Sequence, residues 1–290
     1  MRFGLPLALL LASAGLATGG LAGETKPLRL VSHNLCTDQL LLDLAQPGQI
    51  AGLSPYAAQA QRSYFADKAR PFPILSGTAE DIVVLRPDLV VTGRFSKRET
   101  RAFLRARNVP MEEFDTALSI AETRRQITRF GEITGNTAKA ADRLAELDAA
   151  LAELRAAASA TRLTILPLSR RAWVSGRESL VSDLLIQAGL ANAAADLGFR
   201  FGGFAHLETI VKLRPDAVLL TRDGIEPEDQ GEALLLHPAL RHLFPPERRL
   251  VIPESLTVCG GPMLAEAMRT LARQIRHLKP RVSRVGAPGG

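Results

Sequence analysis

Two stretches of the chain are near copies of each other: Glu80-Asp-Ile-Val-Val-Leu-Arg-Pro-Asp-Leu-Val-Val and Glu208-Thr-Ile-Val-Lys-Leu-Arg-Pro-Asp-Ala-Val-Leu. Each copy begins as a short helix whose shared Ile, Val and Leu are spaced to face inward. The Arg-Pro pair ends the helix because the residue before proline disfavours the α region. The apolar run after the shared Asp is typical of a buried strand. A solenoid needs more copies at closer spacing, so the duplication predicts two similar α/β lobes.

The amino terminus has the pattern of a secretory signal peptide. Arg2 precedes an apolar run over residues 5–16, and small residues follow. The run is too short to span a bilayer. We expect residues 1–23 to be removed, with cleavage after Ala17 or Ala22 fitting equally well. No cysteine stands at the cleavage point, which argues against a lipid anchor, so the mature protein is expected to be soluble in the periplasm.

The composition and charge of the chain limit the kinds of molecule that it is expected to bind. The 290 residues carry a formal net charge of +6 and are 46% hydrophobic, as in a soluble globular protein. Lys and Arg are scattered without an aromatic-interleaved stripe, which disfavours nucleic acid and allows an anionic ligand. Cys36 and Cys259 lie in different halves of the chain. A disulfide and two buried thiols both remain open.

A long helix is predicted in the middle of the chain. Gly135-Asn136 ends the helix before it, and residues 137–158 are Ala-rich, with Leu at helical spacing and no Gly or Pro. At about 1.5 Å per residue this helix is roughly 30 Å long and can cross between lobes. The predicted organisation is a lobe over 24–136, the connecting helix, a second lobe over 159–278, and a loose tail over 279–290.

Candidate site residues lie in loops at or near predicted strand ends, where α/β folds bind ligands. His33 and Asn34 follow the first strand, which runs into a helix that Thr37 is expected to cap. Arg94 and Phe95 follow a later strand and suit a ligand with anionic and aromatic parts. The sequence has no phosphate-binding loop, no nucleophile elbow and no close pair of histidines for zinc. We therefore predict no catalytic residues, no resident metal and no cofactor.

The chain resembles the class III periplasmic binding proteins, the solute receptors of ABC importers for cobalamin, ferric siderophores and haem. The motifs that carry this resemblance are Val31 to Leu44, Ser76 to Arg94, Ser175 to Ser179, and Glu208 to Leu220. The resemblance implies two Rossmann-like lobes joined by one long α-helix, with a ligand cleft between them and little hinge motion. It also implies a monomer that docks on a permease dimer through a Glu on each lobe, here Glu80 and Glu208. A first-turn Glu also suits the helix dipole, but the same register in both lobes favours docking.

The resemblance implies a metal chelate as the ligand. Gly93 stands where the cobalamin receptor has a tryptophan, which weakens the case for cobalamin. An anionic ferric siderophore is favoured by Arg94, Arg170, Arg171 and Arg177, and His33 leaves haem open. The predicted ligand-binding residues are His33, Asn34, Tyr56, Arg94, Phe95, Trp173, Arg177 and Phe204. The alternatives are a haem-binding receptor of the same family and an exported two-lobe enzyme similar to a metal chelatase.

Overall fold

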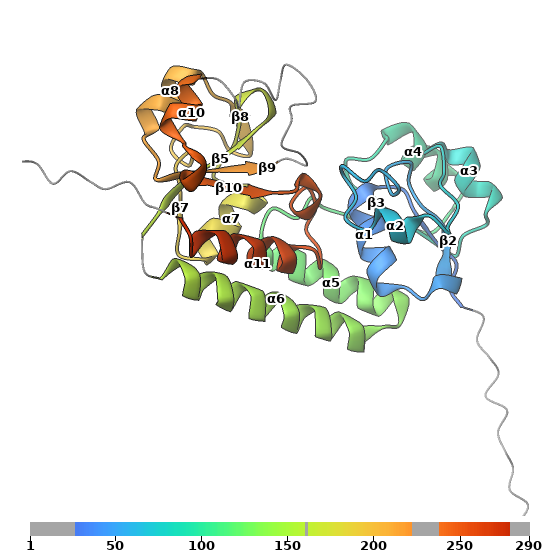
Figure 1. Ribbon diagram of the computed structural model, residues 1–290. Coiled ribbons are helices and arrows are strands. Elements are labelled where there is room, and N and C mark those ends of the chain that lie inside the picture. Colours follow the sequence, from blue (N-terminus) through green and yellow to red (C-terminus); the bar gives the residue numbers. More distant parts are fainter. Residues whose placement is uncertain (1–26, 160–161, 222–237, 279–290) are drawn as a thin grey trace, which may run out of the picture.

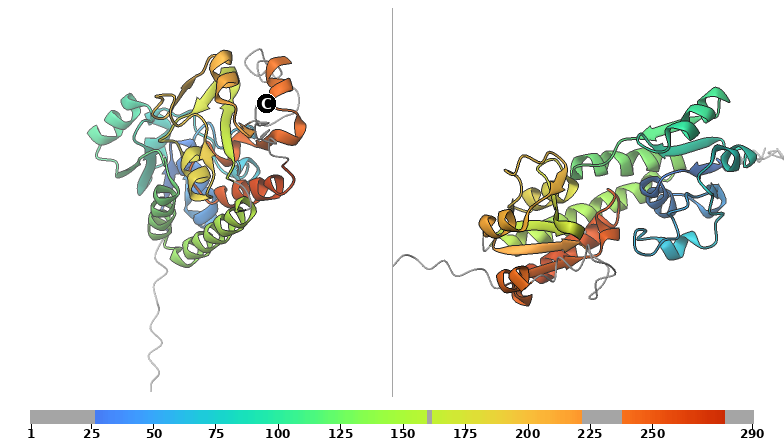
Figure 2. Two further views of the ribbon diagram at one scale, coloured as in Figure 1. Left: turned by 90° about the vertical axis from the view of Figure 1, so that its left-hand side faces the viewer. Right: turned by 90° about the horizontal axis from the view of Figure 1, so that it is seen from above.

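Two α/β lobes stand side by side on a pair of long helices (Figure 1). This computed structural model describes residues 27–159, 162–221 and 238–278, and it confirms the predicted fold class. The expected signal peptide and tail lie outside the described residues. Seen from above, the lobes follow one another along the long axis of the molecule (Figure 2).

The N-terminal lobe is built on a four-stranded parallel sheet. Its strands, in the spatial order β2-β1-β3-β4, are β1 (Leu30–Ser32), β2 (Ile50–Gly52), β3 (Leu89–Gly93) and β4 (Met111–Phe114). Its helices are α1 (Leu35–Leu44), α2 (Ala66–Ala69), α3 (Ala79–Val84) and α4 (Arg98–Ala106). Because all four strands run the same way, their carboxyl ends share one edge. Leu35, which follows β1 at that edge, packs against the second lobe.

The C-terminal lobe has a mixed sheet in the order β10-β9-β5-β6-β8, with β7 beside β5. Its strands are β5 (Thr164–Ser169), β6 (Trp173–Ser175), β7 (Ala191–Asn192), β8 (Gly202–Phe204), β9 (Ala217–Thr221) and β10 (Arg249–Ile252). Its helices are α7 (Leu180–Gln187), α8 (Leu207–Leu213), α10 (Pro238–Leu243) and α11 (Leu264–Ile275), with short 3-10 turns at Arg170–Ala172, Pro246–Arg248 and Glu254–Leu256.

The strands β6 and β8 correct the expectation that the candidate residues Trp173 and Phe204 lie in loops. β6 pairs antiparallel with both β5 and β8. β6 and β8 have three residues each, and β8 contains two glycines, so the local sequence of these strands gives only a weak β signal. Their pairing depends on tertiary contacts that a single segment does not reveal.

A second helix, α5, spans both lobes beside the predicted connecting helix. α5 (Ile120–Thr134) begins in the hydrophobic core of the C-terminal lobe through Ile120 and ends in that of the N-terminal lobe through Phe130. Gly135 then takes the left-handed conformation, with φ at 68°, that ends helices without a Cβ penalty. α6 (Thr137–Ala158) returns beneath both lobes with the predicted bounds, packed against α5 and α11.

The repeated unit folds in the same way in both lobes. Arg86 and Arg214, the residues before proline, both adopt a left-handed conformation with φ at 46°. The carboxylate of Asp88 then accepts the backbone N–H of Arg29 at 2.7 Å, and that of Asp216 accepts the N–H of Thr164 at 2.8 Å. Each Asp backbone N–H returns a bond to the same residue. The shared Asp therefore fixes the start of the first strand of its lobe.

Helix capping differs from the prediction in the N-terminal lobe. The cap of α1 is Asn34, whose side-chain oxygen accepts the N–H groups of Cys36 and Thr37, so the prediction of Thr37 as the cap was wrong. Thr37 instead donates its hydroxyl to the carbonyl of Asn34 at 2.9 Å. The Asn side chain reaches two amides of the first turn, which leaves the threonine hydroxyl for the carbonyl.

Cys36 and Cys259 form a disulfide between the lobes. This resolves the alternative that the sequence left open. Cys36 lies in the first turn of α1, and Cys259 lies in the loop between β10 and α11. The lobes are thus linked covalently at a point far along the chain from α5 and α6. No helix within the described ranges is long and apolar enough to cross a membrane.

Candidate functional site

A cavity of about 490 Å³ opens at the carboxyl ends of β5 and β9 in the C-terminal lobe. We call it the aromatic cavity. Its lining residues are Ser169, Arg170, Arg171, Trp173, Ser175, Val181, Phe204, Thr221, Glu254, Thr257 and Val258. All come from the C-terminal lobe, and the last three come from the loop that carries the disulfide. The site thus lies at the strand ends where α/β folds bind ligands.

Two large aromatic side chains line this cavity while remaining open to solvent. Trp173 is 37% exposed and Phe204 is 59% exposed. Their ring centroids lie 5.0 Å apart at an interplanar angle of 78°, an edge-to-face contact. The antiparallel pairing of β6 with β8 sets Trp173 directly opposite Phe204. A rigid, uncovered aromatic pair of this kind offers an apolar surface to a bulky ligand.

Cationic side chains lie beside the aromatic pair. The Arg171 guanidinium lies 5.8 Å from the ring centroid of Phe204, within cation–π range. Arg171 and Ala172 both have φ at 57°, a left-handed turn that L-residues rarely adopt. The turn places Arg170 and Arg171 directly after β5 and ahead of Trp173. The charged lining consists of these two arginines and Glu254, so the cavity favours an anionic group.

Three of the predicted site residues of the N-terminal lobe are exposed, and the other two, His33 and Asn34, point into the lobe. Tyr56 and Phe95 are exposed at 40% and 82%, and Arg94 forms an exposed ion pair with Asp115 at 2.8 Å. These three residues follow strand ends at the edge that faces the other lobe, but none lines the aromatic cavity. In the C-terminal lobe, Trp173 and Phe204 do line it, whereas Arg177 is exposed and does not.

His33 and Asn34 serve the fold rather than the cavity in this structure. His33 is only 6% exposed, and its ring nitrogens lie 3.4 Å from the Thr92 hydroxyl and 3.1 Å from the Gly77 carbonyl. Burial is the main cause that lowers the pKa of His33, which favours the neutral form of the ring. Asn34 is the cap of α1. The sequence placed both residues correctly after β1 but did not reveal that their side chains turn into the lobe.

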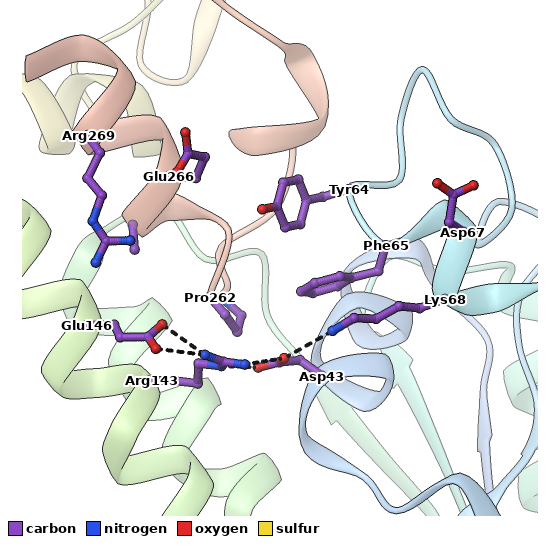
Figure 3. Close-up of a pocket in the computed structure, with 11 residues that line it drawn as sticks. Asp43, Tyr64, Phe65, Asp67, Lys68, Arg143, Glu146, Pro262, Glu266 and Arg269 are labelled. Carbon is purple, nitrogen blue, oxygen red and sulfur yellow. Dashed lines mark hydrogen bonds and ion pairs between the residues drawn. The ribbon is translucent and has the colours of Figure 1, made fainter. Parts of the chain in front are cut away.

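A second cavity, of about 510 Å³, lies on the other side of the disulfide loop and is shown in Figure 3. We call it the ion-pair cavity. Asp43, 1% exposed, binds Arg143 of α6 at 2.7 Å and Lys68 at 3.6 Å, and Arg143 also binds Glu146 at 2.9 Å. Tyr64 and Phe65 form the wall from the N-terminal lobe. Asp43, Lys68, Arg143 and Glu146 of this cavity are thus joined to one another by ion pairs.

Comparison with known proteins assigns the family. The family model described as "Periplasmic binding protein" matches residues 30–245. The chain belongs to the periplasmic binding protein family. A cobalamin-binding protein of Halobacterium salinarum is 25% identical over 207 residues, 68% of this chain and 54% of that protein. The chain therefore spans about half the length of the curated relatives it matches.

Solved structures of the periplasmic binding protein family share the fold. The heme-binding protein RhuT from Roseiflexus sp. RS-1 superimposes with a TM-score of 0.69 at 23% identity, covering 86% of this chain and 98% of that one. A protein of an Fe3+-hydroxamate transport system from Saccharomonospora viridis gives 0.65 at 19% identity, covering 86% and 93%. At these identities the likeness shows the fold alone.

In this periplasmic binding protein the two repeated glutamates occupy matching, exposed positions. Glu80 is the second residue of α3 and Glu208 is the second residue of α8. The two helices lie on the upper side of their respective lobes in Figure 1. Neither Glu lines either cavity.

Sequence reasoning missed part of the cavity wall. Glu254, Thr257 and Val258 line the aromatic cavity from the loop after β10. A signal was present, because Cys259-Gly-Gly follows a predicted strand end. This signal becomes informative only with the disulfide, which bonds the loop to the N-terminal lobe. Within the described residues, no group of three or more His, Cys, Asp or Glu side chains is arranged to hold a metal ion.

Proposed function

We propose that this protein is an exported periplasmic receptor that delivers a metal chelate, a ferric siderophore or a cobalamin-type corrinoid, to an ABC import permease. The observation that carries the proposal is the aromatic cavity, where the exposed Trp173–Phe204 pair stands beside the Arg171 guanidinium. Such chelates combine a bulky organic shell with anionic or strongly polar groups. The cavity offers one surface for each part.

The energetics favour a ligand that covers both rings at once. Burying apolar surface contributes about 25 cal/mol per Å², so covering Trp173 and Phe204 supplies several kcal/mol. The Arg171 guanidinium adds charge-assisted hydrogen bonds to a carboxylate, hydroxamate or phosphate oxygen. The matched relative named as a cobalamin-binding protein and the similar fold from an Fe3+-hydroxamate system support these two ligand classes.

Haem is the second candidate ligand. The similar fold of a heme-binding protein supports it, and Tyr56 of the N-terminal lobe is 40% exposed at the edge facing the cleft. A tyrosine phenolate is a known axial ligand of haem iron. His33, which the sequence suggested for this role, is buried with both ring nitrogens near oxygen partners.

The proposal also covers the partner. We propose that Glu80 and Glu208 bind arginines of a permease dimer, one glutamate from each lobe, and that the receptor is a monomer. The equivalent register of the two residues on α3 and α8 supports this role. A two-lobed protein presents matching charges at both ends to a dimer that repeats its own surface.

The first experiment identifies the ligand and then locates it. Native mass spectrometry of receptor purified from its own periplasm gives the mass of the bound chelate. Trp173, the only tryptophan, reports binding through its fluorescence during titration with that chelate, cyanocobalamin, a ferric hydroxamate and haemin. We expect Phe204→Ala and Arg171→Gln each to raise Kd about tenfold, since each removes a group aimed at the ligand.

Matched controls come from a neighbouring pair of the same chemistry. Arg200 and Phe201 form an exposed cation–π contact at 4.9 Å outside the aromatic cavity. Phe201→Ala and Arg200→Gln should leave Kd within about twofold, the ordinary scatter for residues outside an interface. Equal affinity of the Phe204 and Phe201 variants would place the ligand elsewhere, and binding of none of these chelates would refute the receptor function.

A further inference from the structure

The loop between β10 and α11 separates two open volumes. Glu254, Thr257 and Val258 line the aromatic cavity, whereas Pro262 lines the ion-pair cavity. The loop is therefore flanked by cavities of about 490 and 510 Å³. Protein interiors hold a segment in place by close packing on all sides. Open volume on two sides leaves less of this packing for the loop, whose residues 255–257 and 259–263 are nonetheless buried.

Close noncovalent contacts hold the middle of the loop against α5. A Cβ on Gly260 would lie 2.4 Å from the Thr123 hydroxyl and 2.5 Å from the Ala117 Cβ, so the backbone lies directly against the start of α5. Next to it, Cys259 is 2% exposed and packs in a small apolar cluster with Leu35, Leu256, Met263 and Ala267. The N-terminal lobe contributes Leu35 to this cluster and Cys36, which is half-buried against it.

The disulfide supplies the covalent restraint at the same point. Cys36 lies in the turn that follows β1, an inner strand of the N-terminal sheet, and that turn is held by the Asn34 cap. Cys259 directly follows Val258 in the wall of the aromatic cavity. The bridge thus ties the cavity wall of one lobe to the ligand-facing edge of the other, across 223 residues of sequence.

We propose that the Cys36–Cys259 bridge is a positioning element of the ligand site. It holds the wall formed by residues 254–258 at a fixed place relative to Trp173, Phe204 and the N-terminal lobe. Neither cysteine lines the cavity; the bridge acts through the loop. The effect on affinity rests on the proposed function, whereas the effect on loop position does not. Pre-organised sites bind more tightly because less ordering is required on binding.

The first test needs no ligand. Dithiothreitol reduces the bridge to two cysteine thiols and itself forms a cyclic disulfide, so two electrons and two protons are transferred. With 5-fluorotryptophan, the single tryptophan gives one fluorine resonance from the cavity. We expect a narrow line in the oxidised protein and a shifted or broadened line after reduction. Hydrogen exchange over 253–262 should accelerate about tenfold or more, while α7 stays protected.

The second test separates position from stability. After reduction, 1,3-dibromoacetone links the two sulfurs through three carbons, forming two C–S bonds and releasing two bromides. A cross-link stabilises the fold mainly through the closed loop in the unfolded chain, so this longer link should restore most of the thermal stability. The longer link does not restore the native distance between residues 36 and 259. We expect the reduced and the re-bridged protein both to bind the chelate about tenfold more weakly than the oxidised protein, chiefly through faster dissociation.

The outcomes distinguish the two hypotheses. If the oxidised protein binds none of the chelates, the proposed function fails, and the fluorine resonance with hydrogen exchange still decides whether the bridge positions the loop. An unchanged resonance and unchanged exchange after reduction would overturn the inference. Full recovery of affinity in the re-bridged protein would also overturn it, because the bridge would then act through stability alone. The Cys36→Ser, Cys259→Ser double variant checks that the reductant itself has no effect.

Discussion

A buried carboxyl group supports the first turn of the loop that carries Tyr56. Asp38 accepts the Ser54 N–H at 3.0 Å and also the Ser54 hydroxyl, and that hydroxyl oxygen in turn accepts the Tyr56 N–H at 3.2 Å. Asp38 is fully buried on α1. Burial is the main cause that raises the pKa of Asp38 from 3.8 to about 7. The protonation of one residue is therefore linked to the stability of the lobe.

This linkage predicts an unusual pH dependence. Between pH 4 and 7 the folded state holds a proton on Asp38 that the unfolded state has released, so stability falls as pH rises through this window. Asp38→Asn removes the titration. The free energy of unfolding of wild type minus that of the variant should therefore decrease from pH 4 to pH 7 by at most about 4 kcal/mol. Urea unfolding at several pH values measures it. His33 is present in both proteins, so its own titration cancels, and parallel pH profiles would contradict the prediction.

Residue identity alone predicted only part of the site. Trp173 and Phe204, two of the predicted residues, line the aromatic cavity, whereas Tyr56 and Phe95 do not. His33 and Asn34 had the same sequence context but turn inward. The direction of a side chain after a strand depends on neighbours such as Thr92 and Gly77, which a single sequence does not bring together.

At the scale of elements, regular helices were predictable and short strands were not. α6 was predicted with its observed bounds because a Gly-Asn break and an uninterrupted helical pattern define it locally. β6 and β8 have three residues each and exist through pairing with each other and with β5. The disulfide was left open for the same reason, since its partners lie 223 residues apart.

The shared Asp of the repeated unit is predicted to stabilise the start of the first strand in each lobe. Asp216 accepts the backbone N–H of Thr164 at 2.8 Å at the start of β5. Asp216→Ala leaves this N–H without its charged acceptor, so we expect a loss of about 1–2 kcal/mol in the free energy of unfolding. Asp88→Ala, its counterpart in the other lobe, should behave alike. Asp196→Ala, at an exposed position of the same lobe, is the control, and an equal effect there would refute the special role of the repeated Asp.

At the scale of the whole molecule, the two lobes form one frame. α5 and α6 pass beneath both lobes, Asp43 ties the N-terminal lobe to Arg143 of α6, and the disulfide joins the two lobes. The proposed docking requires α3 and α8 at a fixed separation, which these links between the lobes favour. Two weak contacts on a rigid body reinforce each other, because closing the first raises the effective concentration of the second.

The central claim is tested most directly by the ATPase activity of the proposed partner importer, reconstituted in liposomes. The activity is measured with the wild-type protein, with Glu80→Ala and Glu208→Ala singly, and with the double variant. Each proposed ion pair between a receptor glutamate and a permease arginine contributes at most about 1 kcal/mol to docking. We therefore predict that wild type stimulates the ATPase, that each single variant weakens stimulation modestly, and that the double variant abolishes it while its Kd for the chelate is unchanged. Full stimulation by the double variant, or loss of its chelate affinity, would contradict the account of a two-lobed receptor that docks through its repeated glutamates.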